Sequence, residues 1–361
     1  MSRARDFADL AGSADAGGLT GRNLIINGAM TVAQRGSLTG QTGTVYTACD
    51  RFLSAEVGDT VTTSTQDTDV PSGQGFANSL KIDVTTADAS LAASDVFLVM
   101  TRLEGQDLQH LLYGTSDAKN LTLSFWVKSP KTGTHIAELF QNDATYYNSQ
   151  AYTIASANTW QKVELTFSGY TATAFDDDNG YSLGITWFLA AGSDYTSGTL
   201  SSNTWHNTQA NRAVGQVNCV DDAANNFYIT GVQLEVGETA TPFEHRSYGD
   251  ELARCQRYYE EWGGELAYQP FGYFEGTGTT GFSVLQFTEK RDAPTVTVSD
   301  VTHFHSVRGS VVFSAMVFSQ PVTTHVLCTI SRASNNWASG EIFSWRANNS
   351  TSARIYFNAE L

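Results

Sequence analysis

The chain has 361 residues, two or three times the usual domain length, so we expect two or three hydrophobic cores. It carries 21 Lys and Arg against 37 Asp and Glu, and the resulting net charge of −16 repels phosphate backbones and excludes nucleic acid as the expected partner. Charged residues are only 16% of the chain, aromatic residues are 12% and glycines number 31, which favours an all-β extracellular or virion protein over a cytosolic helical enzyme.

Residues 1–22 form a first segment. The stretch from Arg5 to Leu10 could form one or two helical turns, but several glycines follow and its apolar surface is too small to fold alone. The segment lacks the apolar run of a secretory signal, and no stretch of the chain approaches the roughly 18 apolar residues that span a bilayer. We therefore expect neither export by a signal peptide nor membrane insertion. Two interpretations of the segment remain, a disordered tail or a peptide that orders by docking on a partner.

Residues 23–248 consist of short apolar segments separated by Gly, Ser, Thr, Asn and Asp. In LTLSFWVK, residues 121–128, every second residue is Leu, Phe or Val, so one face of this strand is buried and the other faces away. No helical segment is long enough to connect parallel strands, which predicts an antiparallel sandwich and favours a jelly roll. The predicted strands are residues 23–30, 48–54, 79–86, 95–105, 121–129, 136–142, 160–170, 181–190 and 227–237.

The last of these strands is followed by a different pattern. Gly231 inside it predicts a bend or a bulge in the backbone. Residues 249–264 then predict a short linker helix, because Leu252, Cys255 and Tyr259 lie at i, i+3 and i+7 and two glycines end the stretch. Residues 265–361 return to short strands and predict a second, smaller β domain, for which we expect neighbouring copies to bury its sheet.

No arrangement of residues predicts catalysis. The four cysteines lie far apart without zinc-site spacing, which predicts buried free thiols, and neither HExxH nor GxSxG occurs. Paired acids occur in turns, where adjacent side chains do not define a glycosidase cleft. We therefore predict that the chain is not an enzyme and needs no cofactor. The cysteines are Cys49, Cys219, Cys255 and Cys328.

Six blocks of the sequence resemble the fibre and appendage proteins of tailed bacteriophages and phage-like particles. The blocks are NLIINGAMTVAQRG, ACDRF, LTLSFWVKS, DDDNGYSLGITWFLAAGSDY, FYITGVQLEVGETATPFEHRS and LARCQRYYEEW, and they occur in the order that the family shows. They cover roughly residues 23–262, and the C-terminal part is similar more loosely. The resemblance implies a carbohydrate-binding-module-like jelly roll over residues 23–248, followed by the helix.

The resemblance also implies how the protein is assembled. Such proteins are usually homotrimers that project from a virion, so we expect residues 1–22 to anchor the chain to other virion proteins of the tail or capsid. The helix is expected to form the trimer contact, although it could instead lie against its own sandwich. The anchor residues are Arg3, Arg5, Phe7 and Leu10, and the trimer-contact residues are Leu252, Cys255 and Tyr259.

Glycan binding requires exposed aromatic faces beside side chains that bond hydroxyl groups. Two segments predicted to lie between strands have this mixture, residues 142–152 and 200–212, and a third occurs in residues 331–350 near the C-terminus. The alternative is that these aromatic residues cap the core or the trimer interface. The candidates are Tyr146, Tyr147, Asn148, Trp205, Asn207, Asn335, Asn336, Trp337 and Trp345.

The acidic stretch FDDDNGY suggests a single structural calcium ion, as in many carbohydrate-binding jelly rolls that this domain resembles. Asp176, Asp178 and Asn179 would be its ligands, and a plain turn rich in Asp and Asn is the alternative.

Together these observations predict a non-enzymatic virion fibre or spike, made in the host cytoplasm, that recognises a host-surface glycan during adsorption. A structural head or tail adaptor without a ligand is the main alternative. A secreted carbohydrate-binding module of a polysaccharide-degrading enzyme is a weaker one, because neither a signal peptide nor a catalytic partner domain is evident in this sequence.

Overall fold

The computed structural model describes residues 21–307, 311–332 and 337–361. They divide into two compact units, the first running to Glu251 and including Leu361, the second comprising Leu252–Glu360. The division lies inside helix α3 (Tyr248–Gln256), whereas the sequence predicted boundaries at residues 248 and 264. The predicted anchor residues Arg3, Arg5, Phe7 and Leu10 lie outside the described residues.

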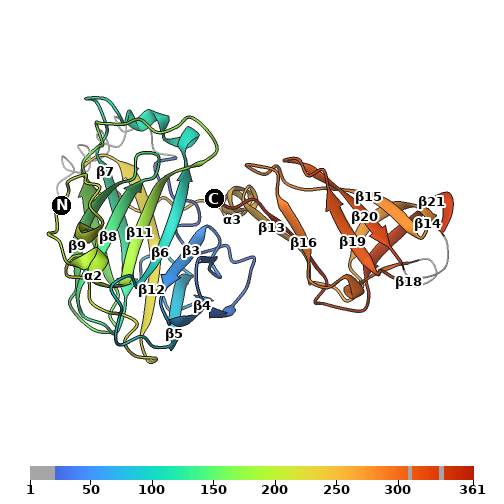
Figure 1. Cartoon of the computed structure of the whole chain (residues 1–361), viewed down its shortest axis with the longest axis horizontal. Coiled ribbons are helices and arrows are strands. Elements are labelled where there is room, and N and C mark those ends of the chain that lie inside the picture. The colour runs from blue at the N-terminus through green and yellow to red at the C-terminus, as the bar shows by residue number, and fades with distance from the viewer. Residues whose placement is uncertain (1–20, 308–310, 333–336) are drawn as a thin grey trace. The chain divides into compact units, whose positions relative to one another are not determined.

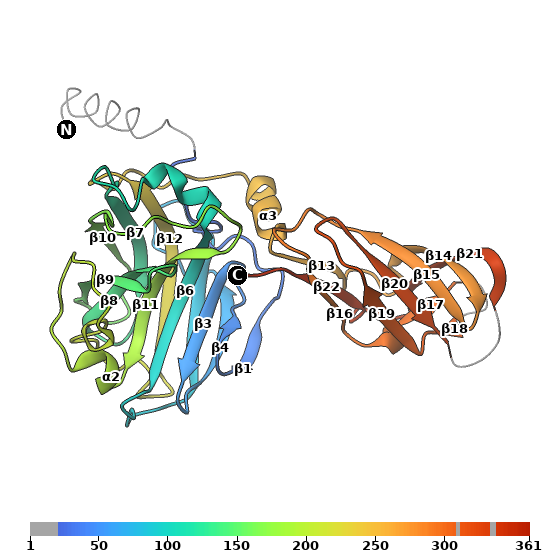
Figure 2. The ribbon, with the colours of Figure 1, turned by 45° about the horizontal axis from the view of Figure 1, so that its top comes forward.

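The first unit is an antiparallel jelly-roll sandwich, as predicted (Figure 1). Sheet A contains β1 (Leu38–Gln41), β4 (Val61–Asp67), β5 (Ser79–Thr86), β12 (Asn226–Val236), β7 (Leu121–Lys128) and β10 (Gln161–Phe167), in this spatial order. Sheet B contains β2 (Val45–Tyr46), β3 (Phe52–Val57), β6 (Val96–Glu104), β11 (Tyr181–Ala191), β8 (Gly133–Gln141) and β9 (Tyr146–Ile154), again in spatial order. Figure 2 shows β3, β6, β11 and β8 side by side. Short helical segments η1 (Gly105–Leu111), α2 (Ser193–Thr196) and η2 (Gln209–Asn211) lie in the connections.

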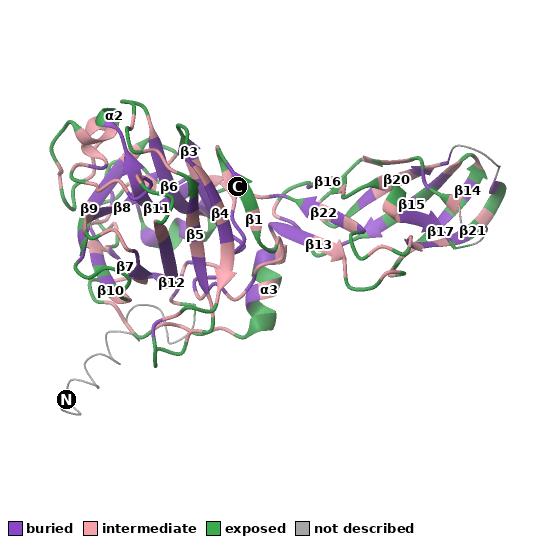
Figure 3. Ribbon diagram, turned by 90° about the horizontal axis from the view of Figure 1, so that it is seen from below, coloured by how far each residue is buried: buried purple, intermediate pink, exposed green. Residues whose placement is uncertain are grey.

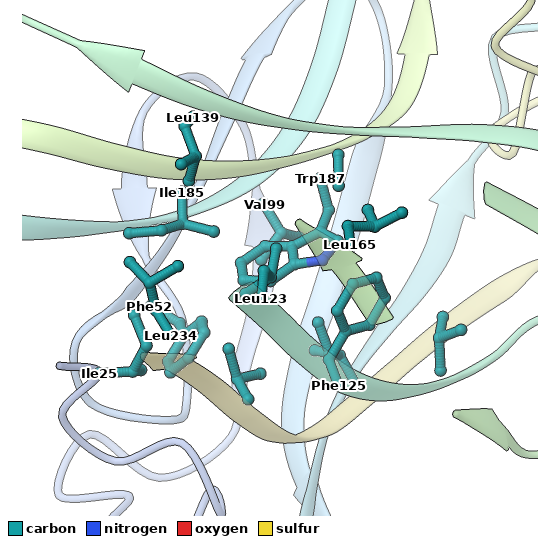
Figure 4. Packing of buried hydrophobic residues seen from close by; sticks show 14 of the residues in the cluster. Ile25, Phe52, Val99, Leu123, Phe125, Leu139, Leu165, Ile185, Trp187 and Leu234 are labelled. Carbon is teal, nitrogen blue, oxygen red and sulfur yellow. The ribbon is translucent and has the colours of Figure 1, made fainter. Parts of the chain in front are cut away.

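The core of the first unit lies between sheets A and B. Leu123 and Phe125 of β7 point toward Val99 of β6 and Trp187 of β11, and all four are fully buried (Figure 4). The inward face of residues 121–128 is therefore the one that the alternation predicted. Figure 3 shows β6, β11 and β12 as largely buried, because these central strands have neighbours on both sides and a sheet across the core.

Residues 23–30 are not a strand, contrary to the prediction. Two asparagine side chains occupy the backbone groups that a strand ladder would use. The Asn23 side chain accepts from the N–H groups of Ile25 (3.0 Å) and Leu234 (3.1 Å) and donates to the Val232 carbonyl (3.0 Å). The Asn27 side chain accepts from Val32 N–H (2.9 Å) and donates to its carbonyl (2.8 Å). This segment is thus fastened to β12 and to the next turn by side chains.

An arginine completes this buried polar network. Arg246 donates to the carbonyl groups of Asn23 and Ile25 and forms an ion pair with Glu251 (3.2 Å). Glu251 also accepts from the N–H of Asn27 (3.1 Å). Residues 23–27 and 246–251 are therefore held together by charged hydrogen bonds, which are stronger than neutral ones.

Two glycines allow this close packing. Gly231 has φ +61 and lies in a register shift between Thr230 and Gln233, so the predicted bulge in β12 is confirmed. Gly28 lies so close to β12 that a Cβ atom on it would be 2.0 Å from the Val232 carbonyl oxygen.

The second unit is a smaller sandwich of sheets C and D around its own core. Sheet C contains β13 (Tyr259–Gly263), β22 (Arg354–Asn358) and β16 (Thr295–Val298). Sheet D contains β18 (Val311–Val312), β17 (Phe304–Ser306), β21 (Trp337–Ala347), β14 (Pro270–Gly278), β15 (Thr280–Gln286), β20 (His325–Ser331) and β19 (Ala315–Ser319), with η3 (Val301–His303) before β17. Both lists follow the spatial order of the strands.

Helix α3 is shorter than predicted. It ends at Gln256, and residues 259–263 form β13, which pairs with β22 from Tyr259↔Asn358 onward. Lys290 donates both to the Gln256 carbonyl and to the Glu260 carboxylate, each at 2.6 Å, and so ends the helix with a buried charge. The prediction of a helix through residue 264 is therefore wrong.

Two of the three residues expected to form the trimer contact are inaccessible to another chain. Cys255 and Tyr259 are buried within the chain itself, and Leu252 is half-buried. This burial agrees with the alternative interpretation, in which the helix lies against its own sandwich, where its Glu251 carboxylate accepts from Asn27 N–H (3.1 Å). The four cysteines are free and buried, as predicted.

His135 is a buried titratable group in the first unit. It has no exposed surface, its Nε2 lies 3.0 Å from the Lys131 carbonyl oxygen, and its ring stacks on Tyr152 with centroids 5.4 Å apart. Cys219 Sγ lies 3.8 Å from His135 Nδ1. Burial lowers the pKa of His135 from 6.5 to about 4 and raises the pKa of Cys219 to about 12, so both groups are neutral at pH 7. In the described part of the chain, no helix has the length and apolar character to cross a membrane.

We predict that Gly28→Ala destabilises the first unit by about 1–3 kcal/mol, because the new methyl group must displace the backbone of β12. Denaturant unfolding monitored by tryptophan fluorescence measures the change. Gly249→Ala is the matched control, since its Cβ meets nothing within 4 Å, and it should be neutral or slightly stabilising. Equal stability of the two variants would contradict the prediction.

We predict that the first unit loses stability as the pH falls from 6.5 toward 4. The pKa of His135 is lower in the folded state, so the unfolded chain binds more protons in this window and the stabilisation present above pH 6.5 is lost on acidification. Between pH 8 and pH 5 the free energy of unfolding should fall by about 2 kcal/mol more in the wild type than in His135→Gln. Urea unfolding at the two pH values measures this, and parallel losses in both proteins would refute it.

Candidate glycan-binding surface

The outward face of sheet A carries aromatic residues among charged ones. The register places Thr230, Trp126 and Lys162 side by side on β12, β7 and β10. It also places Tyr228 of β12 between Lys81 of β5 and Lys128 of β7. These side chains alternate with the buried residues of the same strands, so they lie on the face turned away from the core.

Aromatic rings and ammonium groups contact one another on this face. The Trp160 and Tyr228 rings meet edge to face, with centroids 6.1 Å apart. Lys128 Nζ lies 4.2 Å from the Tyr228 centroid and 5.6 Å from that of Trp160, and Lys81 Nζ lies 5.5 Å from the Tyr228 centroid. Cation–π contacts of this kind hold both the rings and the lysines in fixed positions.

Carboxylates complete the arrangement. Asp69, in the connection between β4 and β5, forms an ion pair with Lys128 and accepts from Trp160 Nε1 (2.8 Å). Lys81 pairs with Asp83 (2.8 Å). Burial raises the pKa of Asp69, but its hydrogen bonds with Lys128 and Trp160 outweigh this and the net pKa is lowered. The two ion pairs and the Trp160 hydrogen bond therefore orient both carboxylates and both lysines before any ligand arrives.

We name these residues the sheet A patch. Trp126 and Trp160 are half-buried, while the Asp69 side chain is 43% exposed and that of Asp83 31% exposed. Aromatic faces suit the apolar side of a pyranose ring, and fixed carboxylate and ammonium groups suit its hydroxyls. Its exposed and half-buried members are Asp69, Lys81, Asp83, Trp126 and Trp160, and Lys128 and Tyr228 are buried members that hold them in position.

Tyr146, Tyr147 and Asn148 do not lie in a loop, contrary to the prediction. They begin β9, which pairs with β8 over its whole length. Tyr147 is buried, stacks on Phe140 with centroids 5.0 Å apart and lies under the Arg212 guanidinium at 4.0 Å. Asn148 is fully buried and faces the interior. Neither can meet a ligand from solvent.

Trp205 and Asn207 lie next to β9, so the structure brings the two predicted segments together. Tyr147 and His206 exchange backbone hydrogen bonds of 2.7 and 2.9 Å. The Trp205 ring packs on Tyr170, with centroids 5.1 Å apart, and its Nε1 donates to the Ser168 carbonyl (2.7 Å). The alternative interpretation therefore holds for Trp205, which caps the core, while Asn207 is exposed.

A buried ion pair helps to keep solvent away from sheet B around Tyr147. Glu138 on β8 has no exposed surface and receives bonds from Arg212 Nε (3.0 Å) and Nη2 (2.7 Å) and from Ser149 Oγ (2.9 Å). Arg212 follows η2, so the connection between β11 and β12 covers this part of sheet B. A buried charge with all these partners is held firmly in place.

The C-terminal candidates are also interior residues where the structure describes them. Trp337 and Trp345 are buried in the core of the second unit, against Phe274 and Phe304 respectively. The prediction that they bind a glycan is therefore wrong, because their rings have no free face. Asn335 and Asn336 lie outside the described residues.

The proposed calcium ligands form a turn. Asp178 Oδ1 accepts from the N–H of Gly180 two residues on (2.8 Å), which is the hydrogen bond of a plain Asp turn, the alternative interpretation. Among the described residues, no group of three or more His, Cys, Asp or Glu side chains is arranged to hold a metal ion. Asp176 and Asn179 belong to the same connection, between β10 and β11.

The sequence did contain one signal of the sheet A patch. Trp126 lies on the polar side of the alternation in residues 121–128, and Trp160 precedes charged residues on the same side of its strand. A large aromatic residue on the solvent face of a strand needs an explanation beyond core packing. Asp69 and Lys81 carried no such signal, because their approach to Trp160 and Tyr228 depends on the order of strands in the sheet.

We compared the chain with known proteins by sequence and by structure. No protein-family model matches the chain, and no curated protein matches it in sequence. A putative sugar-binding protein from Bacteroides thetaiotaomicron has a TM-score of 0.34 at 15% identity, over 60% of this chain and 100% of that one. TmCBM61, solved with β-1,4-galactotriose, has a TM-score of 0.30 at 10% identity, over 60% of this chain and 99% of its own.

The tailspike protein 4 domain of bacteriophage CBA120 has a TM-score of 0.31 at 14% identity. The match covers 60% of this chain and 21% of the tailspike domain. At such low identities and scores, we draw no functional conclusion from these likenesses.

Proposed function

We propose that this chain is a non-enzymatic appendage protein of a phage-type virion whose first unit recognises a host-surface glycan through the sheet A patch. The observation that carries the proposal is the pair of half-buried tryptophans, Trp126 and Trp160, beside two oriented Lys–Asp pairs. Core packing does not account for these rings, since they lie on the solvent face of their strands.

The charge of the first unit narrows the ligand class. This unit has 13 Lys and Arg against 28 Asp and Glu, a net charge of −15. Its field disfavours anionic polysaccharides, and the lysines of the patch are already paired with Asp69 and Asp83. We therefore propose a neutral pyranose, whose C–H face stacks on tryptophan while its hydroxyls bond to the carboxylates and ammonium groups.

The place in the virion rests on the six sequence blocks that resemble phage fibre proteins. Several of these blocks meet in the structure, where NLIINGAM and FEHRS form the polar network around Arg246. A network of this kind explains why such blocks occur together. Attachment through residues 1–22 and assembly into a homotrimer remain part of this proposal.

A ligand-free adaptor is the second candidate. The observation that favours it is the burial of Tyr147, Trp337 and Trp345, three of the five aromatic residues first expected to bind sugar. The two candidates differ only in whether the sheet A patch binds.

We expect the full chain to bind neutral oligosaccharides on a glycan array. Trp126→Ala or Trp160→Ala should raise the dissociation constant about tenfold, because each removes a stacking surface. Tyr248→Ala, which removes an aromatic side chain that is exposed elsewhere, is the control and should bind as the wild type does. Thermal unfolding confirms that each variant is folded. Absence of binding by the wild type would favour the adaptor, and full binding by both tryptophan variants would remove the patch as the site.

A further inference from the structure

The outward face of sheet D carries an apolar surface. The register aligns Ile342 of β21, Glu275 of β14, Phe282 of β15, Thr329 of β20 and Val317 of β19 in one row across five strands. The residues that alternate with them, such as Phe274, Phe343 and Cys328, are buried in the core of the second unit. The row therefore faces away from that core.

Large apolar side chains on this face are highly exposed. Together they present on the order of 500 Å² of surface, close to the upper limit of the largest apolar patch on ordinary monomers. A stable specific interface needs about 800 Å² from each partner, so these side chains alone present more than half of that area. The exposed fractions are 71% for Tyr273, 43% for Phe282, 57% for Val284, 56% for Val317 and 72% for Ile342.

The charge of the second unit indicates what can approach this face. Leu252–Glu360 contains eight Lys and Arg against nine Asp and Glu, a net charge of −1, whereas the first unit has −15. Copies of the chain repel each other through their first units but not through their second units. A nearly neutral surface with large apolar side chains favours association with itself.

Glu275 lies between Ile342 and Phe282 in the middle of the row. Where copies meet through the same face, the Glu275 carboxylates of neighbouring chains are brought toward one another, and like charges in an apolar contact oppose association. This residue therefore limits the affinity of a self-contact. In a contact with a basic partner, the Glu275 carboxylate would instead strengthen the association.

We propose that the outward face of sheet D, formed by Tyr273, Phe282, Val284, Val317 and Ile342, is a contact between copies of this chain. The proposal deepens the assembly part of the proposed function and does not depend on glycan binding. It moves the expected contact from helix α3, whose Cys255 is buried, to the sheet of the second unit.

Sedimentation analysis of the full chain over a range of concentrations tests the proposal. We expect a dimer or a trimer for the wild type. The Phe282→Ser/Ile342→Ser variant should dissociate at concentrations at least tenfold higher than the wild type, and Glu275→Gln should associate several-fold more tightly. Val57→Ser, at an exposed position in the first unit, is the control and should behave as the wild type. Thermal unfolding confirms that the variants remain folded.

A wild type that is monomeric at all concentrations would overturn the proposal, whether or not it binds another protein or a vesicle. An oligomer that persists unchanged in Phe282→Ser/Ile342→Ser would also overturn it, as would weaker association of Glu275→Gln. The glycan array reads the sheet A patch separately, so loss of self-association with retained glycan binding would leave the recognition part of the proposed function intact.

Discussion

The buried polar network around Asn23, Asn27 and Arg246 is the constraint on which the first unit depends. Asn23 fastens the entering segment to β12, a strand with neighbours on both sides in sheet A, through bonds to Val232 and Leu234, and Arg246 fastens it to the chain beyond β12. Each of these bonds spans more than 200 positions of sequence. A buried polar group without a partner destabilises the fold by more than one hydrogen bond stabilises it. Each side chain of the network therefore requires the others. Gly28 and Gly231 supply the space, one for a carbonyl oxygen and the other for the ring of Phe76.

The position of β12 also determines the surface chemistry of sheet A. β12 carries Tyr228 between Lys81 and Lys128, so residues from three distant parts of the sequence meet on one face. Trp160, which precedes β10, and Asp69, in the connection before β5, complete this arrangement. A change that displaces β12 should thus disturb both the core and the patch, whereas removal of one tryptophan ring affects the patch alone.

The sequence predicted the fold class and most strands, because alternation is a local property that Leu121, Leu123, Phe125 and Val127 display without any neighbour. The prediction failed for segments whose structure depends on partners far away in the sequence. Residues 146–148 look like a polar loop, yet they form a strand because β8 supplies their backbone bonds and Arg212 and Ser168 contact their side chains. Residues 259–263 have helical spacing, but pairing with β22 makes them a strand. The candidate site was missed for the same reason, since aromatic content alone does not separate a ring on the solvent face from one such as Trp345 in the core.

The four buried thiols have a consequence for the environments that the chain can tolerate. Burial raises the pKa of Cys219 and Cys328 to about 12, so neither forms the thiolate that oxidants and disulfides attack. No cross-link contributes to either unit across the described residues, because every cysteine there is free. We therefore expect the fold of the described residues to be the same in a reducing medium and in an oxidising one.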